Sequence, residues 1–209
     1  MKIGVFVSGG GSNFTKIHEK ILSSNLHVEV EFLLTNNSKC GGAAYARLQG
    51  IEVKHVSSKT HSEASAYNQA VLDACEGVDL IILAGFMKKL PGELISKFKD
   101  KIVNIHPALL PSFGGHGFYG SKVHEAVFKA GVRISGMTIH FVNEVYDTGD
   151  IIYQDSVQIS GEDSPADIGA KVLKLEHHHF WQVVQGISLG KLSRNTDGRV
   201  VYQHLHQAL

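Results

Sequence analysis

Asn104 and His106 lie two positions apart at the end of an apolar run, directly before Pro107. If that run is a strand, its side chains at positions i and i+2 share one face. The proline disfavours the helical region for His106, so the chain leaves the strand extended and enters a loop. A carboxamide can donate to an oxyanion, and an imidazole can carry a proton near pH 7. The pair therefore suits the attack of an amine on a carbonyl group.

A second polar cluster begins at His140 and continues to a loop that contains Asp147. A carboxylate there could orient His106 and favour its protonated form. Each residue alone has a simple structural explanation, with Asn104 as a turn residue, His106 as a partly buried histidine and Asp147 as a loop cap. Taken together at one predicted strand end, the three leave both the catalytic and the structural interpretation open.

The first apolar run ends in the glycine-rich segment Ser8-Gly9-Gly10-Gly11-Ser12-Asn13. Backbone amides that no side chain shields, placed at the start of a helix, bind anions with help from the helix dipole. The segment lacks the Gly-Lys-Ser/Thr of a Walker A loop and the spacing of GxGxxG, and no acidic residue clearly ends the second run. It therefore predicts a site for one phosphate group rather than a dinucleotide. The alternative is a connecting turn with Ser12 or Asn13 as the N-cap.

Strands and helices alternate through the first half of the chain. We expect strands at 2–7, 28–34, 52–56, 78–84 and 102–105, with helices ending near residue 24 and at 40–49, 62–74 and 91–98. Apolar strands that alternate with helices of this length indicate a parallel sheet that is buried on both faces. The fold class predicted is α/β, a Rossmann-like, doubly wound and mostly parallel sheet with helices on both faces.

The pattern changes after Pro107. The glycine-rich stretch 112–120 predicts a mobile loop over the site, and a helix follows at 121–130. Two strands at 136–142 and 151–157 would add an antiparallel extension to the sheet. A long helix from 164 to 185 and a small strand pair within 194–202 complete the C-terminal part.

Composition excludes several broad classes of function. The 209 residues include 20 basic and 20 acidic side chains, so no overall charge favours nucleic acid or an anionic membrane. Two cysteines do not make a disulfide framework, and no apolar run is long enough to span a membrane, so we expect a cytoplasmic protein. The tract His177-His178-His179 is interpreted as helix surface with room for one functional member, because successive helical side chains point about 100° apart and cannot all bind one metal ion.

Four segments of the chain occur together in one known family. They are Ser8-Gly9-x-Gly11-Ser12-Asn13, Leu83-Ala84-Gly85-Phe86-Met87, Asn104-Ile105-His106-Pro107-x-Leu109-Leu110-Pro111, and His140-Phe141-Val142 followed by Asp147-x-Gly149. With these segments in this order, the chain resembles the folate-dependent formyltransferase family over nearly its whole length. The resemblance implies transfer of a formyl group from 10-formyltetrahydrofolate to the amine of glycinamide ribonucleotide, in de novo purine synthesis.

The resemblance also implies a role for each matching residue. Asn104 would polarise the formyl oxygen, His106 would be the general acid, and Asp147 would support His106 and position a water molecule. The phosphoribosyl substrate would contact Gly10, Gly11, Ser12, Asn13 and Glu176, and the folate would contact Met87, Lys88, Lys89, Leu90, Val142 and Asn143. The folate would be a co-substrate, and no metal would be needed.

We further expect one domain over 1–209, with a phosphate-binding half at 1–100 and a catalytic and folate-binding half at 101–209. The partners would be these small molecules, without nucleic acid or membrane, and the chain would be a monomer or a homodimer. The sequence departs from the family where arginine is common, since it has Ala64 and Lys88, and where lysine occurs in some members, since it has Leu173. Lysine does not replace a bidentate arginine fully.

Other functions remain as alternatives. A tRNA-formylating member of the family usually carries a basic C-terminal domain, and a deformylase typically has an N-terminal regulatory domain; neither is expected in a chain that opens into its first strand and ends at Leu209. A nucleotide-binding or sugar-transforming Rossmann domain would explain the glycine loop but would not need Asn104, His106 or Asp147. A non-catalytic small-molecule sensor would explain only the fold.

Overall fold

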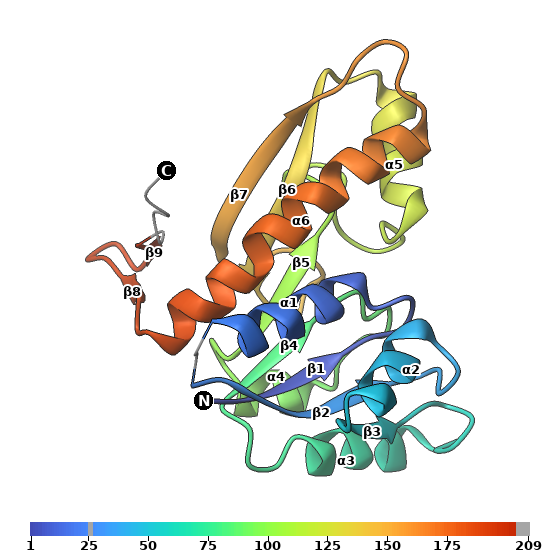
Figure 1. Cartoon of the computed structure of the whole chain (residues 1–209), viewed down its shortest axis with the longest axis vertical. Helices are drawn as coiled ribbons and strands as arrows, with labels where there is room; N and C mark the ends of the chain where they lie inside the picture. The colour runs from blue at the N-terminus through green and yellow to red at the C-terminus, as the bar shows by residue number, and fades with distance from the viewer. Residues whose placement is uncertain (25–26, 204–209) are drawn as a thin grey trace. The chain divides into compact units, whose positions relative to one another are not determined.

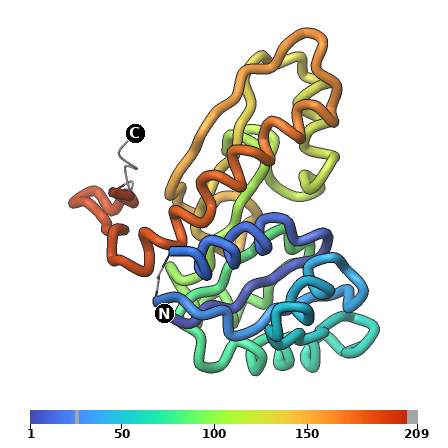
Figure 2. Tube along the Cα trace, in the orientation of Figure 1, coloured from blue at the N-terminus to red at the C-terminus, as the bar shows by residue number. Residues whose placement is uncertain are grey.

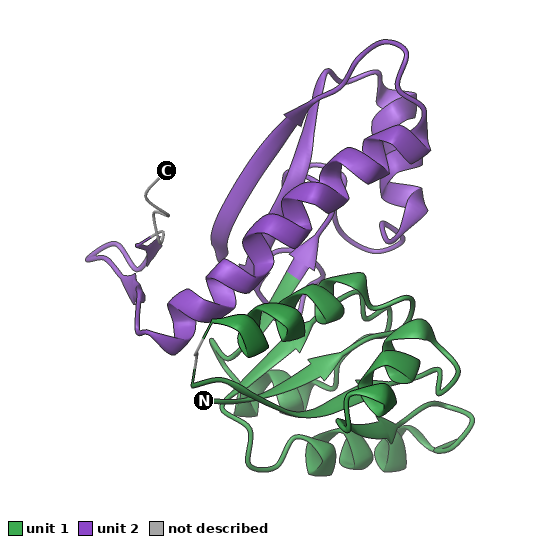
Figure 3. Ribbon diagram, in the orientation of Figure 1, with its two compact units in different colours: residues 1–104 green, residues 105–209 purple. Residues whose placement is uncertain are grey.

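The computed structural model describes residues 1–24 and 27–203. The chain divides into two compact units, unit 1 at Met1–Asn104 and unit 2 at Ile105–Leu209, which are described one at a time (Figure 3). The strand order of the large sheet is β3-β2-β1-β4-β5-β6-β7, and a two-stranded sheet is formed by β8 and β9. This mostly parallel α/β sheet with an antiparallel C-terminal part confirms the predicted fold class.

Unit 1 is a series of βαβ units (Figure 1). Its elements are β1 (Lys2–Phe6), α1 (Ser12–Ser23), β2 (Glu29–Thr35), α2 (Gly41–Leu48), β3 (Glu52–His55), α3 (Ala64–Ala74), β4 (Leu80–Leu83), α4 (Gly92–Lys97) and β5 (Ile102–His106), whose last residues belong to unit 2. The pairs β1–β2, β1–β4, β2–β3 and β4–β5 are all parallel. The strands predicted at 2–7, 28–34, 52–56, 78–84 and 102–105 are therefore confirmed, with small shifts at their ends.

The strands of unit 1 are apolar because helices cover both of their faces. Val5, Phe6, Leu33 and Ile81 are fully buried in the strands. Helix α1 packs against α2, and α3 packs against α4, as expected when right-handed crossovers place successive helices in two layers. The order in which strands are added to the sheet reverses at β1. This strand pairs with β2 on one side and with β4 on the other, and both pairs are parallel. Ligands bind at the carboxyl ends of strands at such a switch point.

Unit 2 combines an antiparallel strand pair with two helices (Figure 2). Its elements are α5 (Ser121–Ala130), β6 (Ile134–Phe141), β7 (Ile151–Gln158), α6 (Pro165–Ser188), β8 (Leu192–Arg194) and β9 (Val200–Tyr202). Strands β6 and β7 pair antiparallel, and α6 packs against both of them and against α5. The predicted antiparallel extension, the helix at 121–130 and the small strand pair are confirmed.

Helix α6 begins with a capping box. The Ser164 side chain accepts a hydrogen bond from the Asp167 backbone, the Asp167 carboxylate accepts one from the Ser164 backbone, and Pro165 occupies the first helical position. This arrangement satisfies amides that a helix start leaves unpaired. Among the helices in the described ranges, none combines the length and the apolar character that crossing a membrane requires.

The interpretation of the histidine tract as helix surface is wrong for His179. Its side chain is buried, its Nε2 lies 2.7 Å from the Asp155 carboxylate, and its ring lies 4.8 Å from that of Tyr153. The cause is the position of α6, whose inner face packs against β7. The described part of the chain contains no cluster of His, Cys, Asp and Glu that could hold a metal ion.

Candidate active site

The structure brings His106 and Asp147 together in unit 2. His106 is the last residue of β5, and Asp147 lies in the loop between β6 and β7. The Nδ1 atom of His106 lies 3.6 Å from Oδ2 of Asp147, and both side chains are largely buried, with 5% and 12% exposed. This distance is too long for a direct hydrogen bond and short enough for an ion pair. Because water is mostly excluded from the pair, the carboxylate acts on the imidazole with little screening.

The second ring nitrogen of His106 is held by the glycine-rich loop. Its Nε2 lies 2.8 Å from the carbonyl oxygen of Phe113, which can only accept, so Nε2 carries the hydrogen. The other nitrogen faces the Asp147 carboxylate, which is also an acceptor when ionised. The doubly protonated ring is therefore the form that can donate to Phe113 and form an ion pair with Asp147.

The same loop positions the carboxylate. The backbone N–H of Gly115 donates to Oδ2 of Asp147 at 2.8 Å. At Gly114, an added Cβ would lie 2.4 Å from a methyl group of Leu110 and 3.2 Å from Cβ of Asp147, so the loop approaches the acid as closely as glycine allows. The prediction that 112–120 is mobile stays a prediction, and in this structure the segment contacts both members of the pair.

The β6–β7 loop places Asp147 with an unusual backbone. Asp147 has a φ of 57°, in the left-handed region that aspartate tolerates better than most residues. Two positions later, a Cβ on Gly149 would lie 1.8 Å from the carbonyl oxygen of Phe141. Only glycine at 149 lets the loop return this close to β6 and carry Asp147 to His106.

His140 is a second histidine beside the same carboxylate. Its Nε2 lies 3.7 Å from Oδ1 of Asp147, its Nδ1 lies 2.8 Å from the carbonyl oxygen of Phe141, and only 2% of its side chain is exposed. Burial lowers the pKa of His140, although the Phe141 carbonyl and the Asp147 charge act in the opposite direction. The neutral ring then donates from Nδ1 to the Phe141 carbonyl.

The turn after His106 is supported by two polar side chains of the strand pair. Thr138 on β6 donates to the Ala108 carbonyl at 2.7 Å and accepts from the Leu110 amide at 3.0 Å. Gln154 on β7 donates to both the Leu110 carbonyl and Thr138 Oγ1, at 3.0 and 2.9 Å. These bonds position the chain between β5 and the glycine-rich loop, which is the part of the site that holds Nε2 of His106.

The other predicted residues of the catalytic half occupy defined places. Asn104 is a half-buried residue of β5 that pairs in register with Leu83 of β4. Glu176 is a buried residue of α6. Val142 and Asn143 follow β6, and the Asn143 carboxamide oxygen accepts hydrogen bonds from the Val145 amide and from Thr148. Asn143 thus holds the loop that carries Asp147.

The glycine loop of unit 1 leads directly into α1. Gly11, at a φ of 76°, precedes the first helical residue, and no side chain caps the helix. The alternative in which Ser12 or Asn13 is the N-cap is therefore wrong. A Cβ on Gly11 would lie 2.6 Å from Cα of Gly42, whereas one on Gly10 would meet nothing within 4 Å. The first turn of α1 thus presents its amides without a capping side chain, next to open space at Gly10.

Ser8 links the glycine loop to the predicted folate segment, and the sequence patterns did not single out this role. Its hydroxyl accepts a hydrogen bond from the Met87 amide at 2.9 Å and donates to the carboxamide oxygen of Asn36 at 2.6 Å. Its own amide donates to the Gly85 carbonyl at 3.1 Å. Met87 is half exposed, Lys88 and Lys89 are exposed, and Leu90 is buried. The carboxyl ends of β1, β2 and β4 are therefore connected through one serine.

Comparisons with known proteins identify the class. The formyl transferase family model matches residues 1–184, so the chain belongs to the formyl transferase family.

Two plant proteins and one bacterial structure are among the most similar. The "Phosphoribosylglycinamide formyltransferase, chloroplastic" of Arabidopsis thaliana is 45% identical over 206 residues, covering 97% of this chain and 70% of the relative. That of Vigna unguiculata is 46% identical over 200 residues, covering 94% of this chain and 64% of the relative. The crystal structure of glycinamide ribonucleotide transformylase 1 from Symbiobacterium toebii matches with a TM-score of 0.88 at 28% identity, covering 97% of this chain and 93% of that chain.

Proposed function

We propose that the chain transfers the formyl group of 10-formyltetrahydrofolate to the amine of glycinamide ribonucleotide, in the synthesis of purines. The observation that carries this proposal is the buried His106–Asp147 pair at the end of β5, the strand that also bears Asn104. Its support is the membership of the formyl transferase family together with the printed names of the plant and bacterial relatives.

In the proposed reaction, the substrate amine attacks the formyl carbon and gives a tetrahedral intermediate with a negatively charged oxygen. The carboxamide N–H of Asn104 is proposed to donate to that oxygen, which stabilises charge that develops only during the reaction. The amine loses a proton and the leaving nitrogen of the folate gains one. His106 is proposed to carry protons between these groups as a general acid.

One nitrogen of His106 is better suited to that role. Because Nε2 is held by the Phe113 carbonyl, we assign the transferable proton to Nδ1, which faces Asp147 across 3.6 Å. A water molecule that hydrogen-bonds to the carboxylate could relay this proton. Asp147 would then stabilise the imidazolium and orient the water, while the Gly115 amide holds the carboxylate.

The ligand contacts are also proposals. We propose that the amides of Gly10, Gly11, Ser12 and Asn13 bind the substrate phosphate and that Glu176 contacts its ribose. The segment from Met87 to Leu90 and the residues Val142 and Asn143 are proposed to contact the folate. The Ser8 bond to the Met87 amide supports the unit 1 part of this assignment, because it ties the folate segment to the phosphate loop.

The experiment that tests the function supplies 10-formyltetrahydrofolate with one of three acceptors and measures release of tetrahydrofolate. We expect release with glycinamide ribonucleotide, and none with initiator methionyl-tRNA or with water alone. Release in water would instead identify a deformylase, and formylation of the tRNA would overturn the proposed substrate.

Gly10→Val is expected to raise the KM for glycinamide ribonucleotide at least about tenfold, because the added side chain would enter the space where a phosphate must approach the amides. The melting temperature should stay close to that of the wild type, since nothing lies within 4 Å of a Cβ at Gly10. Steady-state kinetics with each substrate varied in turn check this result.

The control for Gly10→Val is Gly11→Ala, which is expected to lower the melting temperature because of its positive φ and its contact with Gly42. Equal effects of Gly10→Val on the KM values of ribonucleotide and folate would contradict the placement of the phosphate.

Three further statements stay predictions. We propose a cytoplasmic location, although the two plant relatives are named as chloroplastic. We propose that the chain acts without nucleic acid, as a monomer or a homodimer. We also propose that 1–209 works as one domain with halves at 1–100 and 101–209, close to the boundary between the two compact units.

A further inference from the structure

Ser8 joins the two segments of unit 1 that are proposed to bind the two substrates. It is the first residue of the glycine-rich segment 8–13 after β1, and its hydroxyl accepts from the Met87 amide at 2.9 Å, where the proposed folate segment begins. The Ser8 amide donates to the Gly85 carbonyl at 3.1 Å. The backbone and the side chain of one residue therefore both bind the turn after β4, which fixes the distance between the two segments.

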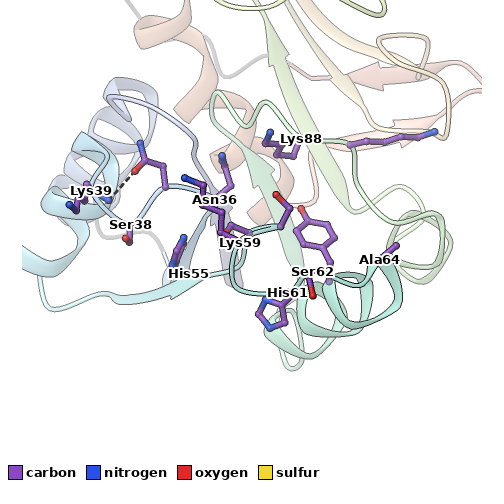
Figure 4. Close-up of a pocket in the computed structure, with 14 residues that line it drawn as sticks. Asn36, Ser38, Lys39, His55, Lys59, His61, Ser62, Ala64 and Lys88 are labelled. Carbon is purple, nitrogen blue, oxygen red and sulfur yellow. Dashed lines mark hydrogen bonds between the residues drawn. The ribbon is translucent and has the colours of Figure 1, made fainter.

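Asn36 fixes the direction of the Ser8 hydroxyl. A serine hydroxyl has one hydrogen to donate and two lone pairs that can accept. The hydrogen is donated to the carboxamide oxygen of Asn36 at 2.6 Å, so the lone pairs remain for the Met87 amide. Asn36 follows β2, and together with Lys88 after β4 it lines a pocket (Figure 4). The hydroxyl thus has one defined partner for donating and one for accepting.

Both of the joined segments are open to a ligand. An added Cβ at Gly9 or at Gly10 would meet nothing within 4 Å. Met87 is half exposed, and Lys88 and Lys89 are exposed. Segments with few packing contacts lose conformational freedom when a ligand holds them. A phosphate bound at the glycine loop would therefore order the first segment and, through Ser8, the beginning of the second.

We propose that Ser8 is a positioning residue that couples the two substrate sites, so that the ribonucleotide and the folate strengthen each other's binding. This inference rests on the proposed function, which assigns the two segments to the two ligands. A first ligand that orders Ser8 also orders the Met87 amide, and the second ligand then loses less conformational entropy when it binds. Because a coupling free energy is reciprocal, each ligand strengthens the binding of the other by the same factor.

The test is isothermal titration calorimetry on the full chain with glycinamide ribonucleotide and tetrahydrofolate, a pair that carries no formyl group to transfer. Each ligand is titrated alone and with the other at saturation, which gives one coupling factor in each direction. In the wild type we expect each Kd to fall about fivefold or more when the other ligand is bound, with equal factors in both directions. In Ser8→Ala we expect the coupling factor to fall by at least about twofold, as for the loss of one neutral hydrogen bond.

Three further variants separate coupling from a general loss of structure. Ser8→Thr keeps the hydroxyl and is expected to keep the coupling of the wild type. Asn36→Leu keeps Ser8 but removes the acceptor that orients its hydroxyl, so the coupling factor should fall as in Ser8→Ala. Ser65→Ala is the matched control, because it removes a hydroxyl from an exposed position of α3. Thermal unfolding of every variant verifies that it is folded.

The outcomes distinguish this inference from the proposed function. If both ligands bind but the coupling factor is the same in the wild type and in Ser8→Ala, the role of Ser8 is wrong and the proposed function stands. Independent binding of the two ligands to the wild type, or an equal loss of coupling in Ser65→Ala, would have the same meaning. A wild type that binds neither ligand would overturn the proposed function, and the coupling with it.

Discussion

His106→Ala is expected to lower the turnover number by ~10²–10⁴-fold, the range that positioned acid–base groups contribute. The reason is geometric, because His106 has one nitrogen held by the Phe113 carbonyl and the other 3.6 Å from a nearly buried carboxylate. Loss of the ring removes the proton carrier but leaves the glycine loop of unit 1 intact. The KM for the ribonucleotide should therefore change little.

The measurement is steady-state formyl transfer with both substrates varied, together with thermal unfolding to show that the variant is folded. His116→Ala is the matched control, since this exposed histidine lies in the same loop and contacts Tyr146 rather than the pair. Asp147→Asn should give a decrease of similar order, because the amide still accepts from Gly115 but no longer carries the charge. The double variant should lose less than the product of the two effects.

His140 offers the sharpest competing explanation, because it lies almost as close to Asp147 as His106 does. Burial lowers the pKa of His140 and so favours a neutral ring, and the bond from this ring to the Phe141 carbonyl gives it a structural role. If turnover survives His106→Ala but is lost in His140→Gln, then His140 and not His106 carries the proton, and our proposal is wrong.

Gly149→Ala is expected to reduce turnover by about 10²-fold, since misplacing a catalytic group by about 1 Å has that effect. It should also lower the free energy of unfolding by ~1–3 kcal/mol, as overpacking does. A Cβ at 149 would lie 1.8 Å from the Phe141 carbonyl oxygen and 3.5 Å from the Asn143 amide, so backbone must move on one side or the other. Either movement displaces the loop that carries Asp147.

Chemical denaturation and formyl transfer on the same preparation check the Gly149→Ala prediction. Gly161→Ala is the control, because its Cβ would meet only the flexible end of the Arg133 side chain, at 3.3 Å. We expect the control to keep both stability and turnover near those of the wild type. Wild-type values for Gly149→Ala would show that the loop does not depend on this close contact.

Local patterns in the sequence were sufficient for the fold class. Apolar runs such as that at 2–7 predicted buried parallel strands, and the long helix predicted from 164 is α6, which begins with Pro165 after Ser164. These signals work because strand burial, helix capping and proline geometry depend on a few neighbouring residues. The same reasoning missed His179, whose burial follows from the packing of α6 against β7 and not from the sequence around it.

The candidate site was only partly predictable. Asn104 and His106 could be placed on one strand end, and the glycine loop could be placed before a helix, because each lies within a short segment. The tie from Ser8 to the Met87 amide could not be predicted, since it joins residues from the ends of two strands.

By itself, the sequence determined which chemical groups are available at the end of β5: a carboxamide, an imidazole and a proline that turns the chain away. The sequence also named Asp147 as a candidate partner of that imidazole. Only the tertiary structure decided that the two lie 3.6 Å apart, that His140 shares the same carboxylate, and that Phe113 holds Nε2. The reason is that such neighbours depend on how two strands pair and how closely a loop can return. That closeness is set here by the contact of Gly114 with the Leu110 and Asp147 side chains and by the contact of Gly149 with the Phe141 backbone.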